Sequence, residues 1–151
     1  MEKLFESALF TRESLLKIMD ELTMDQLISI PDGFKNSIFW NIAHLLVSQQ
    51  LLIYGLSGKP LLIEEDFVKR YRKGTMASLN VTNEDMEFVR ENLVKLHKQT
   101  KYDFEHGMFL EYTPYMTSAN INLVSIEDAI TFSTYHDGIH LGVVLSLKKL
   151  V

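Results

Sequence analysis

Apolar residues recur at helical spacing along four long segments of the chain. Within each segment they stand at positions i, i+3 and i+4, which places them on one face of an α-helix. The predicted helices span residues 2–21, 36–56, 83–106 and 125–151. The three prolines all fall between these segments, where they interrupt no helix. The pattern predicts an all-α fold, a four-helix bundle within a single domain that covers residues 1–151.

The second predicted helix differs from the others because apolar residues occupy almost all of its sides. Residues 38–54 contain few polar side chains, among them Asn41, His44 and Ser48. A helix with this composition is buried on more than one face. Two arrangements meet that requirement: the helix lies centrally in the bundle, or it also packs against a second subunit.

Two long connections separate the helices, residues 57–81 and 107–124. Apolar residues around Phe67 alternate with basic ones up to Lys73, so we expect a short helix there with a solvated basic face. In the second connection, residues 113–116 are expected to be extended. Connections of this length inside a compact domain are often functional, and the first could cross the bundle or cover a pocket.

Composition limits the possible functions. The apolar fraction is 46% and the charged fraction 23%, which is typical of a globular protein. The net charge of −5 leaves no basic stripe for phosphate groups, so we expect no nucleic-acid partner. The chain has no cysteine, no signal-peptide pattern and no apolar run of membrane-spanning length. We therefore expect a soluble, cytoplasmic protein that does not enter a membrane.

The histidines supply the candidate chemistry. His136 and His140 stand four residues apart on the last predicted helix, so their side chains share one face. His44 lies in an equally apolar part of the second helix, whereas His97 and His106 have polar neighbours and are expected at the surface. The first three are either core histidines bonded to nearby polar groups or the ligands of one divalent metal ion. Three protein ligands would leave an open coordination position, as in catalytic metal sites.

Several neighbours of these histidines permit more than one interpretation. Asn41 and Ser48 either orient a metal ligand or merely give the helix a polar strip. Trp40 either lines a pocket or packs in the core or at an interface. Asp137 is expected to face water, and so is Arg12 on the first helix.

Three stretches of the chain resemble the DinB/YfiT superfamily of metal-dependent four-helix proteins. They are Trp40-Asn41-Ile42-Ala43-His44-Leu45, His136-Asp137-Gly138-Ile139-His140-Leu141-Gly142 and the opening Thr11-Arg12 with Leu15-Leu16. The resemblance implies an up-down-down-up bundle, a metal site at His44, His136 and His140, and a homodimer. It also implies an activity on a small molecule, because characterised relatives include transferases and isomerases that use low-molecular-weight thiols.

The chain departs from the family pattern at two positions near the predicted metal. Asp137 stands where the family often has Glu, and Val143 where it often has Gln. A general acid or base at either position is therefore in doubt. We predict a metal-dependent transferase or hydrolase, with zinc or nickel favoured and iron or copper compatible with the ligands. The alternatives are a stress-associated metal-binding module without catalysis and a helical interaction protein without metal.

Overall fold

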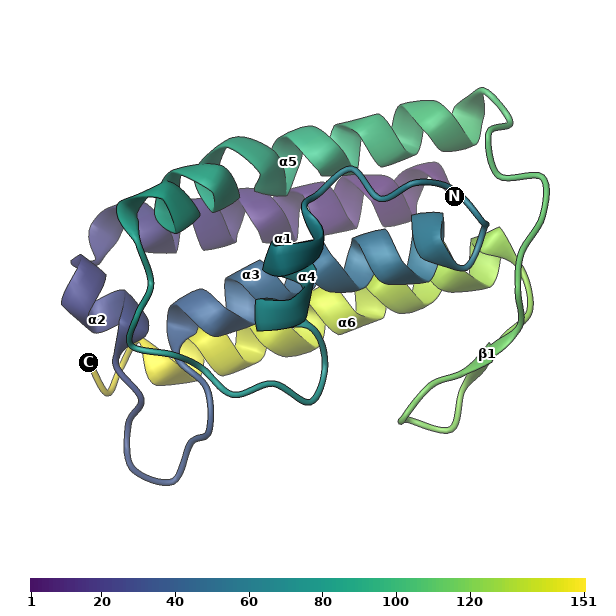
Figure 1. Ribbon diagram of the computed structural model, residues 1–151. Coiled ribbons are helices and arrows are strands. Elements are labelled where there is room, and N and C mark those ends of the chain that lie inside the picture. The colour runs from purple at the N-terminus through teal and green to yellow at the C-terminus, as the bar shows by residue number, and fades with distance from the viewer.

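The computed structural model describes all 151 residues and is mostly helical. Its long helices lie lengthwise beside one another, with the first and last helices in contact (Figure 1). The helices are α1 (Glu2–Glu21), α2 (Met24–Ile28), α3 (Ile38–Gln49), η1 (Gln50–Gly55), α4 (Glu65–Tyr71), α5 (Asn83–Glu105) and α6 (Ile126–Leu147). No helix is both long enough and apolar enough to span a membrane.

The helix ends follow local capping chemistry. Thr23 and Thr82 each form a capping box at the start of α2 and α5. The threonine side chain accepts a hydrogen bond from the backbone N–H three residues later, and the side chain of that later residue accepts one from the threonine N–H. Ser37 caps α3 by accepting a hydrogen bond from the backbone N–H of Trp40 at 3.2 Å. The all-α prediction is confirmed at this level, with helix bounds that differ from the predicted ones by a few residues.

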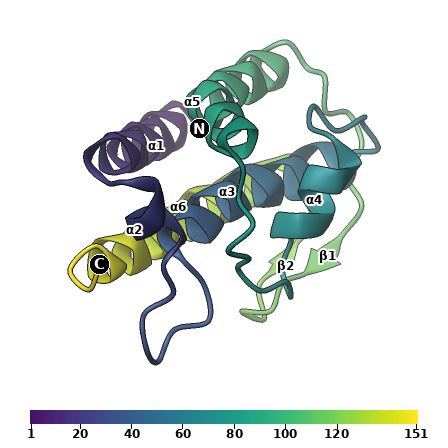
Figure 2. The same cartoon turned by 60° about the vertical axis from the view of Figure 1, so that its left-hand side comes forward.

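Helix α3 is buried on all sides within its own chain. Every residue from 38 to 47 is buried, because α3 packs against α2, α4, α5 and α6. Helix α4 belongs to the first long connection and covers α3 with Phe67, Val68 and Tyr71 (Figure 2). All the apolar sides of α3 are therefore buried without a second subunit, and the first long connection covers one of them.

The second half of the predicted second helix is a π-helix, η1, instead of a continuation of α3. Its wider turn inserts an additional residue into each hydrogen-bonded ring, and such turns are frequent at functional sites. The Gln50 side chain accepts a hydrogen bond from the backbone N–H of Leu62 at 2.8 Å, which ties the following loop to this turn. The apolar pattern could not distinguish this turn from an α-helix.

The second long connection contains a small antiparallel hairpin. Strand β1 (Tyr115–Met116) pairs with β2 (Asn122–Leu123), with Tyr115 opposite Leu123. The hairpin projects from the end of the bundle near the start of α6 (Figure 1), and Leu123 is buried. The predicted extended segment is thus one strand of a hairpin that closes over α6.

Three polar residues that the sequence pattern assigned to the surface are buried. Arg12 and Asp137 have side chains about 1% exposed and form an ion pair with Nε to Oδ2 at 2.8 Å. The expectation that both face water is wrong, because each charge is satisfied by the other inside the bundle. His97 is 5% exposed and donates a hydrogen bond from Nε2 to the carbonyl oxygen of Phe5 at 2.9 Å, while His106 is exposed as expected.

Candidate metal centre

The structure brings the three predicted histidines together from two helices. His44 projects from α3, and His136 and His140 project from adjacent turns of α6. One ring nitrogen of each lies within 4.8 Å of the corresponding nitrogens of the other two. His44 is buried and the α6 pair is half-buried, so the cluster lies at the edge of the core.

His44 is held in one orientation by its surroundings. Its Nδ1–H donates to the carbonyl oxygen of Tyr71 at 2.7 Å, so its Nε2 keeps a lone pair. The hydroxyl of Ser48 donates to that Nε2 at 3.1 Å. Trp40 stacks on the imidazole with the ring centroids 4.6 Å apart. The short helix α4 therefore sets the tautomer of a histidine on α3.

His140 is oriented by Asn41, which reaches across from α3. The Nδ1–H of His140 donates to the amide oxygen of Asn41 at 2.7 Å. The amide nitrogen of Asn41 donates to the Ser37 carbonyl at 2.8 Å, which fixes which end of the amide faces the histidine. Asn41 therefore orients a histidine, which was one of the two interpretations of its position in the sequence. The histidine that it orients is His140 on α6, however, and not its helix neighbour His44.

The geometry of the nitrogens fits a metal ion. The Nε2 atoms of His136 and His140 lie 3.1 Å apart, and the hydrogen-bond pattern leaves a lone pair on that of His140. Two nitrogens bound to one ion at about 2.1 Å and at bond angles near 90–110° are separated by roughly 3.0–3.4 Å. The Nε2 atoms of His136 and His140 thus have the spacing of neighbouring ligands, and a ring nitrogen of His44 lies within 4.8 Å of a nitrogen of each. The Nδ1–H groups of His44 and His140 are already bonded elsewhere.

The cluster favours neutral imidazoles. Burial, together with the neighbouring His136 and His44, lowers the pKa of His140 to about 3. Burial also lowers the pKa of His136 to about 4, with His44 and Arg12 adding to the effect. Burial lowers the pKa of His44, against the effect of its bond to Tyr71. Neutral imidazoles are the form that binds metal, so no proton has to leave before binding near neutral pH.

The Arg12–Asp137 pair fixes the rotation of α6 beside the histidines. Arg12 also donates to the Gln49 side-chain oxygen at 2.9 Å and to the Leu93 carbonyl at 3.1 Å, so it joins α1, α3, α5 and α6. Burial raises the pKa of the Asp137 carboxyl, and the guanidinium opposes that shift. Because Asp137 is the residue after His136, this anchor holds the two histidines on the side of α6 that faces α3. Asp137 is therefore no candidate acid or base.

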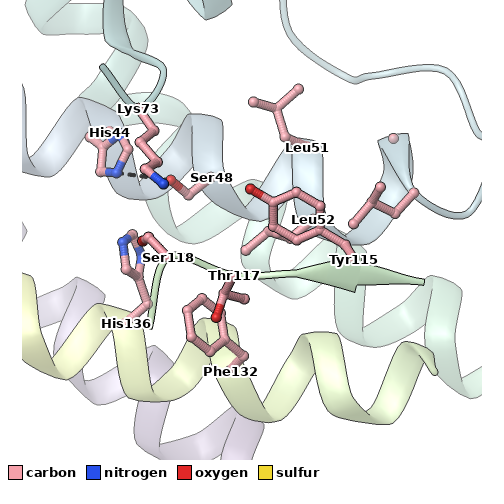
Figure 3. A pocket seen from close by; sticks show the side chains of 12 residues that line it. His44, Ser48, Leu51, Leu52, Lys73, Tyr115, Thr117, Ser118, Phe132 and His136 are labelled. Atoms are coloured by element: carbon pink, nitrogen blue, oxygen red, sulfur yellow. Dashed lines mark hydrogen bonds between the residues drawn. The ribbon is translucent and has the colours of Figure 1, made fainter. Parts of the chain in front are cut away.

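A cavity of about 370 Å³ opens beside the histidines (Figure 3). Its lining combines an apolar wall with hydroxyl groups, one lysine and two of the three histidines, and it includes no carboxylate. The lining residues are His44, Ser48, Leu51, Leu52, Gly55, Leu56, Lys73, Tyr115, Thr117, Ser118, Phe132 and His136. The π-helix and the residue after it supply Leu51, Leu52, Gly55 and Leu56, so the unusual turn forms one wall.

The two long connections also contribute to the lining. Lys73 is exposed, as expected for a solvated basic face, and it also lines the cavity, while Tyr115 reaches the cavity from the hairpin. Tyr112, the other loop tyrosine, packs against the smaller core cluster near Phe5 instead. No periodic pattern marks these positions, because their placement depends on how the two long connections fold over α3 and α6.

Comparison with known proteins identifies one family. A family model described as the DinB superfamily matches residues 9–144, a range that includes all three histidines. No curated protein matches the chain.

Proposed function

Because this chain belongs to the DinB superfamily, we propose that it binds one divalent metal ion and uses it on a small molecule in the adjacent cavity. The proposed ligands are the Nε2 atoms of His44, His136 and His140, and in His44 the ion would replace the hydrogen bond from the Ser48 hydroxyl. One observation carries the proposal: three imidazoles converge beside a cavity, two of them on its wall, and two of the three have their Nδ1–H groups bonded to fixed acceptors. Histidines that only pack in the core can each bond to a separate polar group and need not lie close to one another.

The proposed metal is zinc or nickel. Three neutral imidazole nitrogens suit both ions, and they also accept iron or copper. The chain has no cysteine that would add a thiolate ligand. Two ligands lie on the cavity wall, which supports an open coordination position that faces the substrate.

The proposed reaction is a transfer that uses a thiol, in preference to hydrolysis. A bound divalent ion would act as a Lewis acid and lower the pKa of a coordinated thiol or water. Activation of water usually benefits from a nearby carboxylate base, but no Asp or Glu lines the cavity and Asp137 is paired with Arg12. Ser48, Thr117 and Ser118 offer hydroxyls that can position a substrate. A thiol, which loses its proton more readily than water, fits this lining better.

A second candidate is a metal-binding module without catalysis, as in a stress-associated binding protein. The same lack of a carboxylate in the cavity favours it, since the two histidines of the lining are proposed metal ligands and no Asp or Glu is present to act as a general base. In this case the ion and its ligands would hold α3 and α6 together or bind a small molecule. A cytoplasmic location stays a prediction from the sequence in either case.

The arrangement that we propose for the chain is one domain with an up-down-down-up four-helix bundle. The first long connection, with α4 inside it, supports this topology because α3 and α5 then run in the same direction and need a crossing segment (Figure 1). The contacts of α1 with α5 and α6, and of α3 with the same two helices, agree with it.

We further propose a homodimer that forms through α6. Tyr135, Ile139 and Leu145 are 53%, 44% and 47% exposed on its outer face. Gly138 and Gly142 lie among them, and a Cβ added at either glycine would meet no atom within 4 Å, so that face is open. The exposed face of α6 supports a dimer, whereas the apolar second helix does not, because α3 packs within its own chain.

Metal analysis of the purified, untagged protein tests the metal site. We expect roughly one divalent ion per chain, lost in His136→Ala and in His140→Ala. His106→Ala is the matched control, because His106 is exposed and bonds only to the carbonyl oxygen of Tyr102 in its own helix. Folded wild-type protein that binds no zinc or nickel on titration would overturn the proposal.

Turnover separates the two candidate functions. A panel of thiols and electrophiles is assayed with the metal-loaded protein and with His136→Ala. Metal-dependent thiol transfer supports the transferase. If removal of the ion changes only the melting temperature, the chain is the non-catalytic module.

A further inference from the structure

The cavity beside the histidines has two chemically different ends. Figure 3 shows Lys73, Ser48 and the His44 imidazole gathered at one end, with His136 and Ser118 nearby. Leu51, Leu52 and the ring of Tyr115 lie at the other end, and Phe132 and Thr117 lie below the space between the two ends. A ligand that fills this space must itself have a polar head and an apolar body.

The charge at the polar end is positive and is not neutralised by the protein. Lys73 forms no ion pair with any carboxylate, although other basic residues of the same connection, Lys69 and Arg70, do. The cavity lining contains no Asp or Glu. A negatively charged head would therefore meet an ammonium group and no opposing carboxylate, whereas a cationic head would meet repulsion.

The apolar wall excludes a strongly hydrophilic ligand. Leu51, Leu52, Leu56 and Phe132 carry no hydrogen-bonding side-chain groups, so polar atoms placed against them would lose their water without replacement. The volume of about 370 Å³ is near the lower end for small-molecule pockets. The cavity thus suits a compact apolar body in preference to a peptide-like or sugar-like one.

From these observations we propose that the cavity selects small anionic amphiphiles, molecules with one negatively charged head and a short hydrocarbon or aromatic body. The head lies between Lys73 and the histidine end, and the body lies along the π-helix wall. The inference rests on the proposed function for its biological meaning, since it names the substrate class of the same site. The binding itself depends on the cavity and on Lys73.

Octanoate is a suitable probe, with 1-octanol and octylamine as neutral and cationic analogues of the same chain length. Binding is measured by isothermal titration calorimetry with metal-free and metal-loaded protein. The fluorescence of Trp40, the single tryptophan, which stacks on His44, gives an independent signal at the polar end. We expect octanoate to bind several-fold more tightly than either analogue in both forms of the protein.

Lys73→Gln separates the charge from the apolar wall. We expect this variant to weaken octanoate binding by about fivefold and to leave octanol binding unchanged, because an exposed charge pair contributes about that factor. Lys149→Gln is the matched control, since Lys149 is a lysine near the C-terminus that does not line the cavity. Circular dichroism confirms that both variants are folded.

Three results would overturn the inference: no octanoate binding at millimolar concentration, equal affinity for the three probes, or an unchanged octanoate affinity in Lys73→Gln. Octanoate binding to metal-free protein that depends on Lys73 supports it even if metal analysis finds no ion. Conversely, a metal-loaded protein that turns over only hydrophilic thiols and ignores octanoate supports the proposed function and rejects this substrate class.

Discussion

Asn41 shows how one amide can serve two helices. Its nitrogen is bonded to the Ser37 carbonyl in its own helix, and its oxygen accepts the Nδ1–H of His140 on α6. Asn92 makes the same kind of bond, from its side-chain nitrogen to the Phe88 carbonyl at 2.8 Å, but no hydrogen bond joins it to a histidine. The two residues therefore differ in the contact that matters for the metal site.

Asn41→Ala is expected to lower metal affinity by about 10- to 100-fold, because His140 loses the acceptor that fixes its orientation. Competition with a chelator of known affinity measures the change. Asn92→Ala, which removes a comparable bond within a helix, should leave metal affinity unchanged. Equal losses in the two variants would show that Asn41 acts only through helix stability.

Arg12→Ala should lower the free energy of unfolding by about 3–5 kcal/mol, because it leaves the Asp137 carboxylate buried without a partner. Urea denaturation of the metal-free protein measures this. Arg90→Ala removes a different Arg–Asp pair, with Asp20, between α5 and α1 at the surface, and should cost less than about 1 kcal/mol.

A double replacement tests the reason for that loss. Arg12→Met combined with Asp137→Leu removes both charges and should recover much of the stability, since it leaves no unpaired charge in the core. If the double variant is as unstable as Arg12→Ala, the packing of the arginine rather than its charge is what the bundle requires.

At the scale of elements, His97 joins α5 to the start of α1. Burial lowers its pKa to about 4, and the nearby charge of Arg12 adds to the effect. In the unfolded chain the pKa returns to about 6.5. Between about pH 6.5 and pH 4 the unfolded chain binds a proton at His97 and the folded chain does not. The contribution of His97 to the free energy of unfolding is therefore fully present above about pH 6.5 and is lost as the pH falls toward 4.

The expected loss from His97 alone is about 3 kcal/mol across that pH range. His97→Gln keeps a donor for the Phe5 carbonyl but cannot take up the proton. The metal-free variant should therefore lose less stability than the wild type between about pH 7 and pH 4, measured by urea denaturation at each pH. The same acid dependence in both proteins would contradict this role for His97.

The elements differ in how well the sequence predicts them. Helices α1 and α5 have periodic apolar faces, and α5 and α6 begin at residues whose side chains cap them, so these features follow from short-range chemistry. The π-turn of η1 could not be predicted, because its apolar residues satisfy an α-helical pattern equally well. Arg12 and Asp137 were misplaced for a related reason: they are 125 residues apart, and no local pattern records the pairing.

The candidate site was predicted in part. The spacing of His136 and His140 and the apolar context of His44 left core histidines as an alternative, and the family resemblance implied that the three form a metal site. The structure places the three within reach of one ion. The groups that orient them, the Tyr71 carbonyl and the Asn41 amide, depend on tertiary packing. The same is true of the cavity, whose polar end comes from a loop that carries no periodic signal.

For the whole molecule, the open face of α6 is the surface to test for self-association. Leu145→Glu should convert a dimer into a monomer, because it places a charge in an apolar interface. Light scattering after gel filtration measures the mass. Leu110→Glu is the control, since Leu110 is 86% exposed on a loop outside that face. A monomeric wild-type protein at high concentration would reject the dimer.

The placement of the three histidines has a consequence for the unfolded chain as a polymer. His136 and His140 are neighbours in sequence, but His44 lies 92 residues away (136 minus 44). To bring His44 to the other two histidines, an unfolded chain must close a loop of that length, which costs about 4 kcal/mol in conformational entropy. Folding closes the loop beforehand, so an ion with three histidine ligands would bind the native chain selectively and stabilise it by mass action.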